Sequence, residues 1–199
     1  MTRISLLACA AVAWALPLTS AIAADAFHCP PAGTMVTTDT GRVFNWMGSV
    51  PDNDAICLAR EGKNPPRFWT YALVPSDDRL SADVDLTGLR RFFPLRPGEP
   101  INLNYRRTFE GSNRPFRVVG VVQQGTPMTV GGLTRQVLVI NANSPNAGPG
   151  LRGGNNATFR GRFVIDQPTN ALLAVDLTDL GRRVGPPTVH WRATSLQLP

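Results

Sequence analysis

The sequence predicts an all-β fold, a single antiparallel β-sandwich or partly open barrel with at most one or two short helical turns. Apolar residues recur at every second position along most of the chain, which is the period of a strand with one buried face. The 18 prolines and 18 glycines divide the chain into short runs, as in sandwiches and barrels. A length of 199 residues fits one domain with a substantial core.

The first 23 residues have the three-part composition of a bacterial secretory signal peptide. Arg3 is followed by an apolar run from Ile4 to Leu18, and small residues then lead to Ala23. The A-x-A arrangement that ends at Ala23 predicts cleavage before Ala24. Because the apolar run is shorter than the roughly 20 residues of a membrane-spanning helix, we expect cleavage rather than an uncleaved anchor.

Cleavage leaves residues 24–199, which we expect to form a single β-rich extracytoplasmic domain, periplasmic or secreted, without a transmembrane helix. Cys29 and Cys57 are the only cysteines of this mature chain. We expect them to form a disulfide because oxidation is the default outside the cytoplasm. Closing a loop of this length adds roughly 3 to 4 kcal/mol of stability through loop-closure entropy. Two free thiols are the alternative, since spacing alone does not show that the two Cβ atoms meet.

Four strands and a short helix are expected in the first half of the domain. A hairpin turn at Thr40-Gly41 separates the first two strands. The four strand runs are Thr34 to Asp39, Val43 to Gly48, Cys57 to Ala59 and Phe68 to Val74. Ser76 to Asp78 can cap the helix that follows. Leu86, Leu89 and Phe93 are spaced to pack on one side of it, over one or two turns.

Strand patterns resume at Ile101 and continue to the end of the chain. Ile101, Leu103 and Tyr105 share one face, while polar residues share the other. The later runs are Phe116 to Val122, Arg135 to Ile140, Thr158 to Ile165, Ala171 to Val175 and Thr188 to Leu198. We expect Asn141 to Asn156 to be irregular because its composition is that of a loop. Altogether, nine or ten strands are expected to form an antiparallel sheet folded on itself.

Several phrases occur in a recognisable order along the mature chain. They are Gly33-Thr34-Met35-Val36 leading to Trp46, Pro51-Asp52-Asn53-Asp54-Ala55-Ile56-Cys57, Phe93-Pro94-Leu95-Arg96-Pro97-Gly98, Val118-Val119-Gly120 and Met128-Thr129-Val130-Gly131-Gly132-Leu133. This order resembles that of uncharacterised secreted or periplasmic β-rich proteins of proteobacteria, a domain of unknown function. Those proteins carry a tryptophan before a D-D-x-x-C turn, a P-L-x-x-G phrase and a V-x-x-G turn between strands. The chain departs from their pattern at Gly131-Gly132, where an Ala-Gly turn is usual. The resemblance implies a β-rich extracytoplasmic protein and transfers no activity and no catalytic residue.

No motif in the sequence predicts a catalytic, metal or cofactor site. The mature chain has two histidines, His28 and His190, but no G-x-S-x-G elbow surrounds any serine. Neither a complete cation loop nor a phosphate-binding loop occurs. We therefore expect no cofactor and no metal, and the absence of a motif favours a non-enzymatic role while leaving activity open. A hydrolase of envelope polymers is the third hypothesis, which gains support if His190 and an aspartate meet in a cleft.

Arginine dominates the positive charge of the chain, whose formal net charge is +6 at pH 7. Arg160 and Arg162 share one face of an expected strand. Arg106 and Arg117 lie near them if consecutive strands pair. Guanidinium groups bind phosphate and carboxylate oxygens in pairs. The leading hypothesis is therefore a non-enzymatic periplasmic or cell-envelope protein that binds an anionic envelope polymer or lipid head group, and no nucleic acid, through this basic strand face. An ordinary solvated face balanced by acidic residues is the alternative.

Aromatic residues define a second hypothesis, a small-ligand-binding β-barrel with an aromatic-lined pocket. Trp69, Tyr71 and Trp191 can stack on a sugar or close such a pocket. The alternative places them in the core, because Trp69 and Tyr71 alternate with Thr70 as core residues do. The sequence leaves the ligand and the oligomeric state open.

Overall fold

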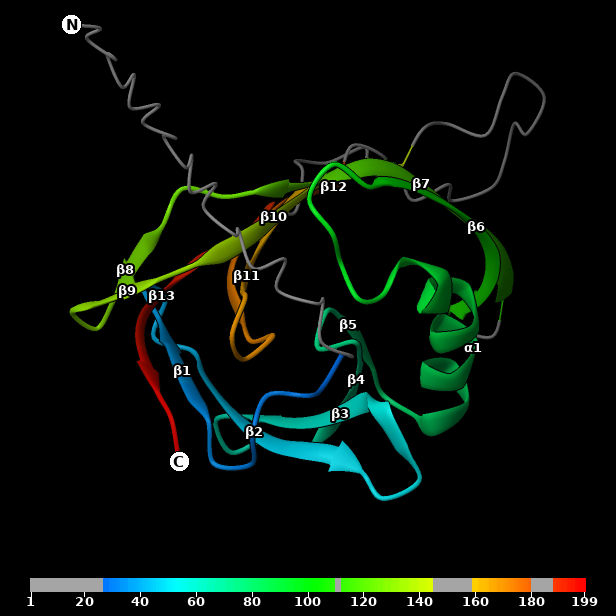
Figure 1. Ribbon diagram of the computed structural model, residues 1–199. Helices are drawn as coiled ribbons and strands as arrows, with labels where there is room; N and C mark the ends of the chain where they lie inside the picture. The colour runs from blue at the N-terminus through cyan, green and yellow to red at the C-terminus, as the bar shows by residue number, and fades with distance from the viewer. Residues whose placement is uncertain (1–26, 110–111, 145–158, 180–187) are drawn as a thin grey trace, which may run out of the picture.

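The computed structural model describes residues 27–109, 112–144, 159–179 and 188–199, so the predicted signal peptide lies outside the described residues (Figure 1). The fold is all-β, as predicted. Its main element is one antiparallel sheet of 11 strands, which curves around a central core (Figure 1). The face of the sheet that points to this core is its inner face, and the opposite face is its outer face.

Strands make up most of the secondary structure in the described residues. The strands are β1 (Met35–Thr38), β2 (Val43–Val50), β3 (Asn53–Glu61), β4 (Arg67–Thr70), β5 (Val74–Ser76), β6 (Pro100–Phe109), β7 (Ser112–Gln124), β8 (Met128–Val130), β9 (Leu133–Arg135), β10 (Val137–Asn143), β11 (Phe159–Asp166), β12 (Leu172–Asp179) and β13 (Thr188–Gln197). The main sheet has the order β5-β4-β3-β2-β1-β13-β12-β11-β10-β7-β6, while β8 and β9 form a separate hairpin. Strand β13 therefore pairs with β1 on one side and β12 on the other.

The sheet remains open between its edge strands, and a helix occupies this side. Helix α1 (Arg79–Leu89) packs against β6 and against β3, β4 and β5, so it lies between the two edges (Figure 1). A 3₁₀ helix, η1 (Arg90–Phe92), continues it. No helix in the described part of the chain has the length and apolar character needed to cross a membrane.

The helix is longer than the one or two turns expected from the sequence. It has 11 residues and begins after Asp78, whose carboxylate accepts a hydrogen bond of 2.8 Å from the backbone N–H of Ser81. Its buried side includes Asp85, which is fully buried and accepts a hydrogen bond of 3.0 Å from the hydroxyl of Ser76. A buried aspartate interrupts the apolar spacing from which helix length is predicted.

Several expected boundaries also differ from the structure, and two of them bear on the candidate sites. The expected strand Phe68 to Val74 is interrupted, because Tyr71 and Ala72 adopt left-handed backbone conformations with φ of 53° and 52° between β4 and β5. The expected irregular segment begins later than Asn141, because β10 continues to Asn143 between β7 and β11. Residues 145–158 of that segment lie outside the described residues.

Aromatic rings and the disulfide occupy the inner core near β2, β3 and β13. Phe44 packs with its ring centroid 5.9 Å from that of Trp69 and 5.4 Å from that of Trp191. Cys57 of β3 forms a disulfide with Cys29, with the two Cα atoms 5.5 Å apart, which confirms the predicted bond. The disulfide attaches the segment before β1 to the sheet.

Candidate functional site

Strands β10, β11 and β12 change from apolar to polar at the same level of their outer face. Val139, Val164 and Ala174 lie in one row across these strands, and all three are buried. The chain leading to the β8–β9 hairpin packs at this end. A Cβ atom added to Gly125 would lie 2.7 Å from the side chain of Val137 and 2.8 Å from that of Val139. In the next row of the outer face, two residues away on each of these strands, the side chains are polar.

The polar row consists of Asn141, Arg162 and Asp176, with His190 of β13 next to Asp176. The guanidinium Nη1 of Arg162 lies 3.9 Å from Oδ2 of Asp176. The Nδ1 atom of His190 is hydrogen-bonded to Oδ1 of the same carboxylate. Asn141 donates a hydrogen bond of 2.9 Å from Nδ2 to Gln123. Asp176 therefore lies between two basic side chains, Arg162 and His190.

The following row adds Asn143, Arg160 and Thr178, and a hollow of about 450 Å³ lies over the two rows. We call it the arginine hollow. It is lined by Asn141, Ala142, Asn143, Arg160, Gly161, Arg162, Asp176 and Thr178. Arg160 is exposed and has no ion-pair partner within the described residues. The hollow thus combines two guanidinium groups, two amides and a hydroxyl with one carboxylate.

The outer face around the hollow carries further arginines. Arg117 of β7 is exposed and lies two residues from Val119, which pairs with Asn143. Arg192 of β13 is exposed and pairs with Ala174. Arg106 occupies β6 opposite Pro115, and its side chain lies outside the described part.

We call the outer face that carries Arg117, Arg160, Arg162, His190 and Arg192 the basic face. Two carboxylates lie beside it in the described part of the chain. One is Asp176, and the other is Asp39, which accepts a hydrogen bond of 2.9 Å from the backbone N–H of Arg192. Sequence reasoning did not assign the asparagines of β10 to a site because it expected a loop there. It also omitted Arg192, although the alternation of His190 and Arg192 along one strand was available as a signal.

Comparison with known proteins adds one distant likeness. No family model matches this chain. No curated protein matches it in sequence. Among solved structures, the chain is similar to the crystal structure of the hypothetical lipoprotein YmcC from Escherichia coli K12, with a TM-score of 0.43 and 9% sequence identity over 83% of this chain and 84% of that chain. At this level of likeness, inference about function rests on the residues themselves.

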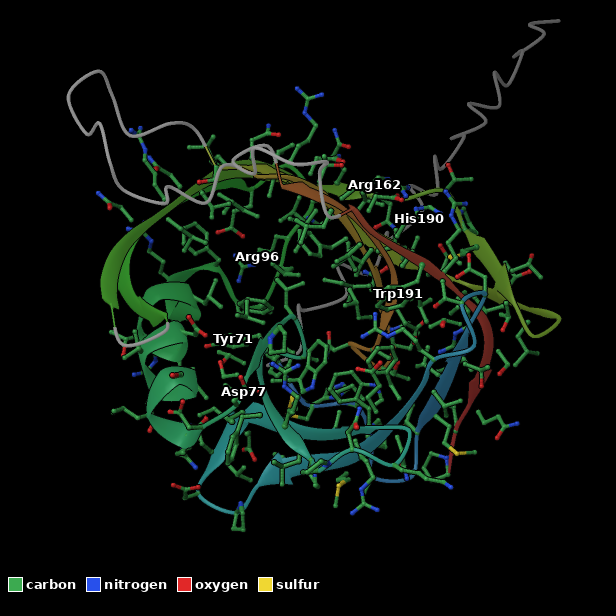
Figure 2. All side chains as sticks on the ribbon, turned by 180° about the vertical axis from the view of Figure 1, so that it is seen from behind. Tyr71, Asp77, Arg96, Arg162, His190 and Trp191 are labelled. Atoms are coloured by element: carbon green, nitrogen blue, oxygen red, sulfur yellow. A yellow bond between two sulfur atoms is a disulfide. The ribbon has the colours of Figure 1, made fainter. Side chains whose placement is uncertain are left out.

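The three aromatic candidates are all buried in the inner core. Trp69 and Trp191 are only 9% and 3% exposed, and both pack in the inner core. Tyr71 is 6% exposed, and its side chain points to the inner side of the sheet (Figure 2). It also lines a second hollow together with Phe27 and Phe93. The structure therefore brings Arg160 and Arg162 together on the outer face of the sheet, whereas the three aromatic candidates lie in the inner core.

Proposed function

We propose that the mature chain is a non-enzymatic protein of the bacterial cell envelope that binds an anionic polymer or lipid head group through the arginine hollow. The observation that carries the proposal is the pair Arg160 and Arg162, exposed on alternate residues of β11 at the two sides of a hollow. Each guanidinium group presents paired donors that match the oxygens of a phosphate or carboxylate. The period-2 geometry of the strand aims both groups at the same ligand.

The balance of charge in the hollow favours an anionic ligand. Among the described residues that line it, Asp176 is the one carboxylate, and this group is already shared by Arg162 and His190. The positive charge of Arg160 has no such compensation within the described residues. Asn141 and Asn143 add amide donors beside the guanidinium groups. An incoming anion therefore meets more donors than acceptors.

Co-sedimentation of the mature chain with isolated sacculi and, separately, with anionic phospholipid vesicles tests this proposal. We expect Arg160→Gln/Arg162→Gln to weaken binding about ten- to a hundredfold, because two charge-assisted contacts are lost. We also expect high salt to release the wild-type protein, since exposed charges are screened. The partner that pellets the protein distinguishes a polymer from a lipid head group.

The matched control is Arg60→Gln/Arg96→Gln, which removes the same net charge from two exposed arginines outside the hollow. Its binding should remain close to that of the wild type. Equal loss in the two double variants would show that net charge alone drives association and would contradict a site at β11.

Hydrolysis of an envelope polymer is a second candidate function, because His190 is hydrogen-bonded to Asp176. His190 meets Asp176 beside the hollow, an arrangement in which a carboxylate can orient an imidazole as a general base. However, His190 is 53% exposed, and no hydroxyl is hydrogen-bonded to its ring within the described residues.

We expect the wild-type protein to release no soluble fragments from sacculi, and we expect His190→Ala to behave identically. Chromatography of the supernatant after prolonged incubation measures this release. Fragments that the wild type releases and His190→Ala does not, with binding retained, would establish the hydrolase in place of a binding protein.

A further inference from the structure

An apolar cavity of about 90 Å³ lies inside the sheet on the side where it remains open. On the sheet side, its wall includes Leu103 of β6, with Ile140 and Ala142 of β10. On the other side, Leu89 of α1 and Phe93 of the following loop complete it. The side chains that line the cavity are all apolar in the part of the chain that the structure describes. It is smaller than the cavity of about 150 Å³ that holds benzene in an engineered protein, so it can hold only the last few carbon atoms of an apolar chain.

A second hollow, of about 440 Å³, lies on the other side of Phe93. We call it the tyrosine hollow. The ring of Tyr71 stacks on that of Phe93 with centroids 3.8 Å apart, and Phe27 contacts both rings edge-on at 4.9 and 5.5 Å. Phe93 lines both spaces, and the adjacent residues Leu89 and Arg90 line one space each. The two spaces are therefore neighbours with an aromatic wall between them.

The backbone at this wall is held in an unfavourable conformation. Tyr71 and Ala72 have backbone φ angles of 53° and 52°, values that residues other than glycine rarely adopt. Residues in such conformations persist only where the surrounding structure stabilises them, and they are concentrated at active sites and ligand-binding sites. Here the left-handed pair directs the Tyr71 ring onto Phe93 rather than continuing β4.

The rim of the tyrosine hollow offers more donors than acceptors. Arg90 is exposed and has no ion-pair partner within the described residues. Asn53 accepts a hydrogen bond of 3.0 Å from the N–H of Ala55 through Oδ1, which leaves its Nδ2 as a donor. Burial raises the pKa of Tyr71, so its hydroxyl keeps its proton and can donate. Asp54, the one carboxylate among the described residues of the rim, accepts a hydrogen bond of 3.4 Å from the hydroxyl of Ser49.

We infer that the two spaces form one binding site for a small amphiphile, with an acidic head at Arg90 and an apolar tail that crosses the tyrosine hollow and ends in the cavity beyond Phe93. The head group meets guanidinium, amide and hydroxyl donors, and the tail meets only apolar side chains. Phe93 is the side chain past which the tail passes. The cavity lies on the inner face of the sheet and the arginine hollow lies on its outer face, with Ala142 of β10 contributing to the lining of both. The inference goes beyond the proposed envelope binding and does not depend on it.

Octanoate is the probe, with acetate and octanol as references that lack the tail or the charge. Thermal unfolding and calorimetric titration of the mature chain, without envelope material, measure the binding. We expect octanoate to raise the melting temperature, octanol to raise it less, and acetate to leave it unchanged. We expect Arg90→Gln to weaken octanoate about tenfold, the loss of one charged contact, and to leave octanol unaffected.

Substitutions at Ala142 test the cavity, and a substitution at Arg60 provides the control. Ala142→Val, with Ala142→Leu as the larger step, fills the cavity and should weaken octanoate and octanol alike while the melting temperature without ligand is maintained. Arg60→Gln, an exposed arginine at the far end of β3, should bind octanoate as the wild type does. Absence of any octanoate binding, or equal loss in Arg90→Gln and Arg60→Gln, would overturn the inference. Arg160→Gln/Arg162→Gln should retain octanoate binding, which separates this result from a failure of the arginine hollow.

Discussion

Replacing Asp166 with asparagine is expected to lower the free energy of unfolding by about 3 kcal/mol, the lower end of the range for breaking a buried ion pair. Asp166 is fully buried at the end of β11. It accepts hydrogen bonds of 2.8 and 2.7 Å from Nε and Nη2 of Arg135, and one of 2.5 Å from the hydroxyl of Thr169. Because the Arg135 side chain is only 14% exposed, the substitution leaves a largely buried positive charge without its counterion.

Urea unfolding measures this difference, and Asp77→Asn provides the matched control. The Asp77 side chain is 83% exposed and pairs with Arg67 at 2.8 Å, so its loss should change the free energy of unfolding by less than about 1 kcal/mol. Similar effects of the two substitutions would show that the Arg135–Asp166 pair contributes no more than a surface ion pair. A destabilised Asp166→Asn protein should also lose order in β9, which carries Arg135.

Removal of the disulfide by Cys29→Ala/Cys57→Ala is expected to lower the free energy of unfolding by roughly 3 to 4 kcal/mol. The bond joins residues with a sequence separation of 28, and the unfolded chain gains the entropy of that open loop when the bond is absent. Cys57 is fully buried, so alanine avoids the unsatisfied hydroxyl that serine would introduce.

Urea unfolding of the wild type with and without a reducing agent checks the same contribution independently. The midpoint of the wild type should fall on reduction, whereas that of the double variant should not move. A wild-type midpoint that is insensitive to complete reduction would mean that the disulfide adds nothing to stability. Because Cys29 is close in sequence to Phe27, reduction should also loosen one wall of the tyrosine hollow.

Much of the strand content could be predicted because inward and outward side chains alternate regularly. In β2, Phe44 and Trp46 are buried while Val43 and Asn45 are exposed, as the period of 2 requires. The same period correctly placed Arg160 and Arg162 on one exposed face of β11. The alternation of apolar and polar residues along a strand thus predicted correctly which side chains point inward and which point outward.

The errors arose where tertiary contacts opposed local preference. Asn141 and Asn143 extend β10 although asparagine is disfavoured in strands, because β7 and β11 pair with that strand on both sides. Tyr71 favours a strand by composition, yet its backbone is left-handed. The contact between His190 and Asp176 depends on the register of β12 against β13, which no local pattern reveals.

The placement of β13 has a consequence for how the molecule is assembled. This strand is later in the chain than every other strand of the sheet, and it alone connects β1 to β12. Until it is synthesised and free to pair, the strands on its two sides cannot join into one sheet, and each side presents an unpaired edge. Such edges can pair with other chains, so incomplete molecules are prone to association. Completion of the fold is therefore a late and long-range event, which is typical of slow-folding β proteins.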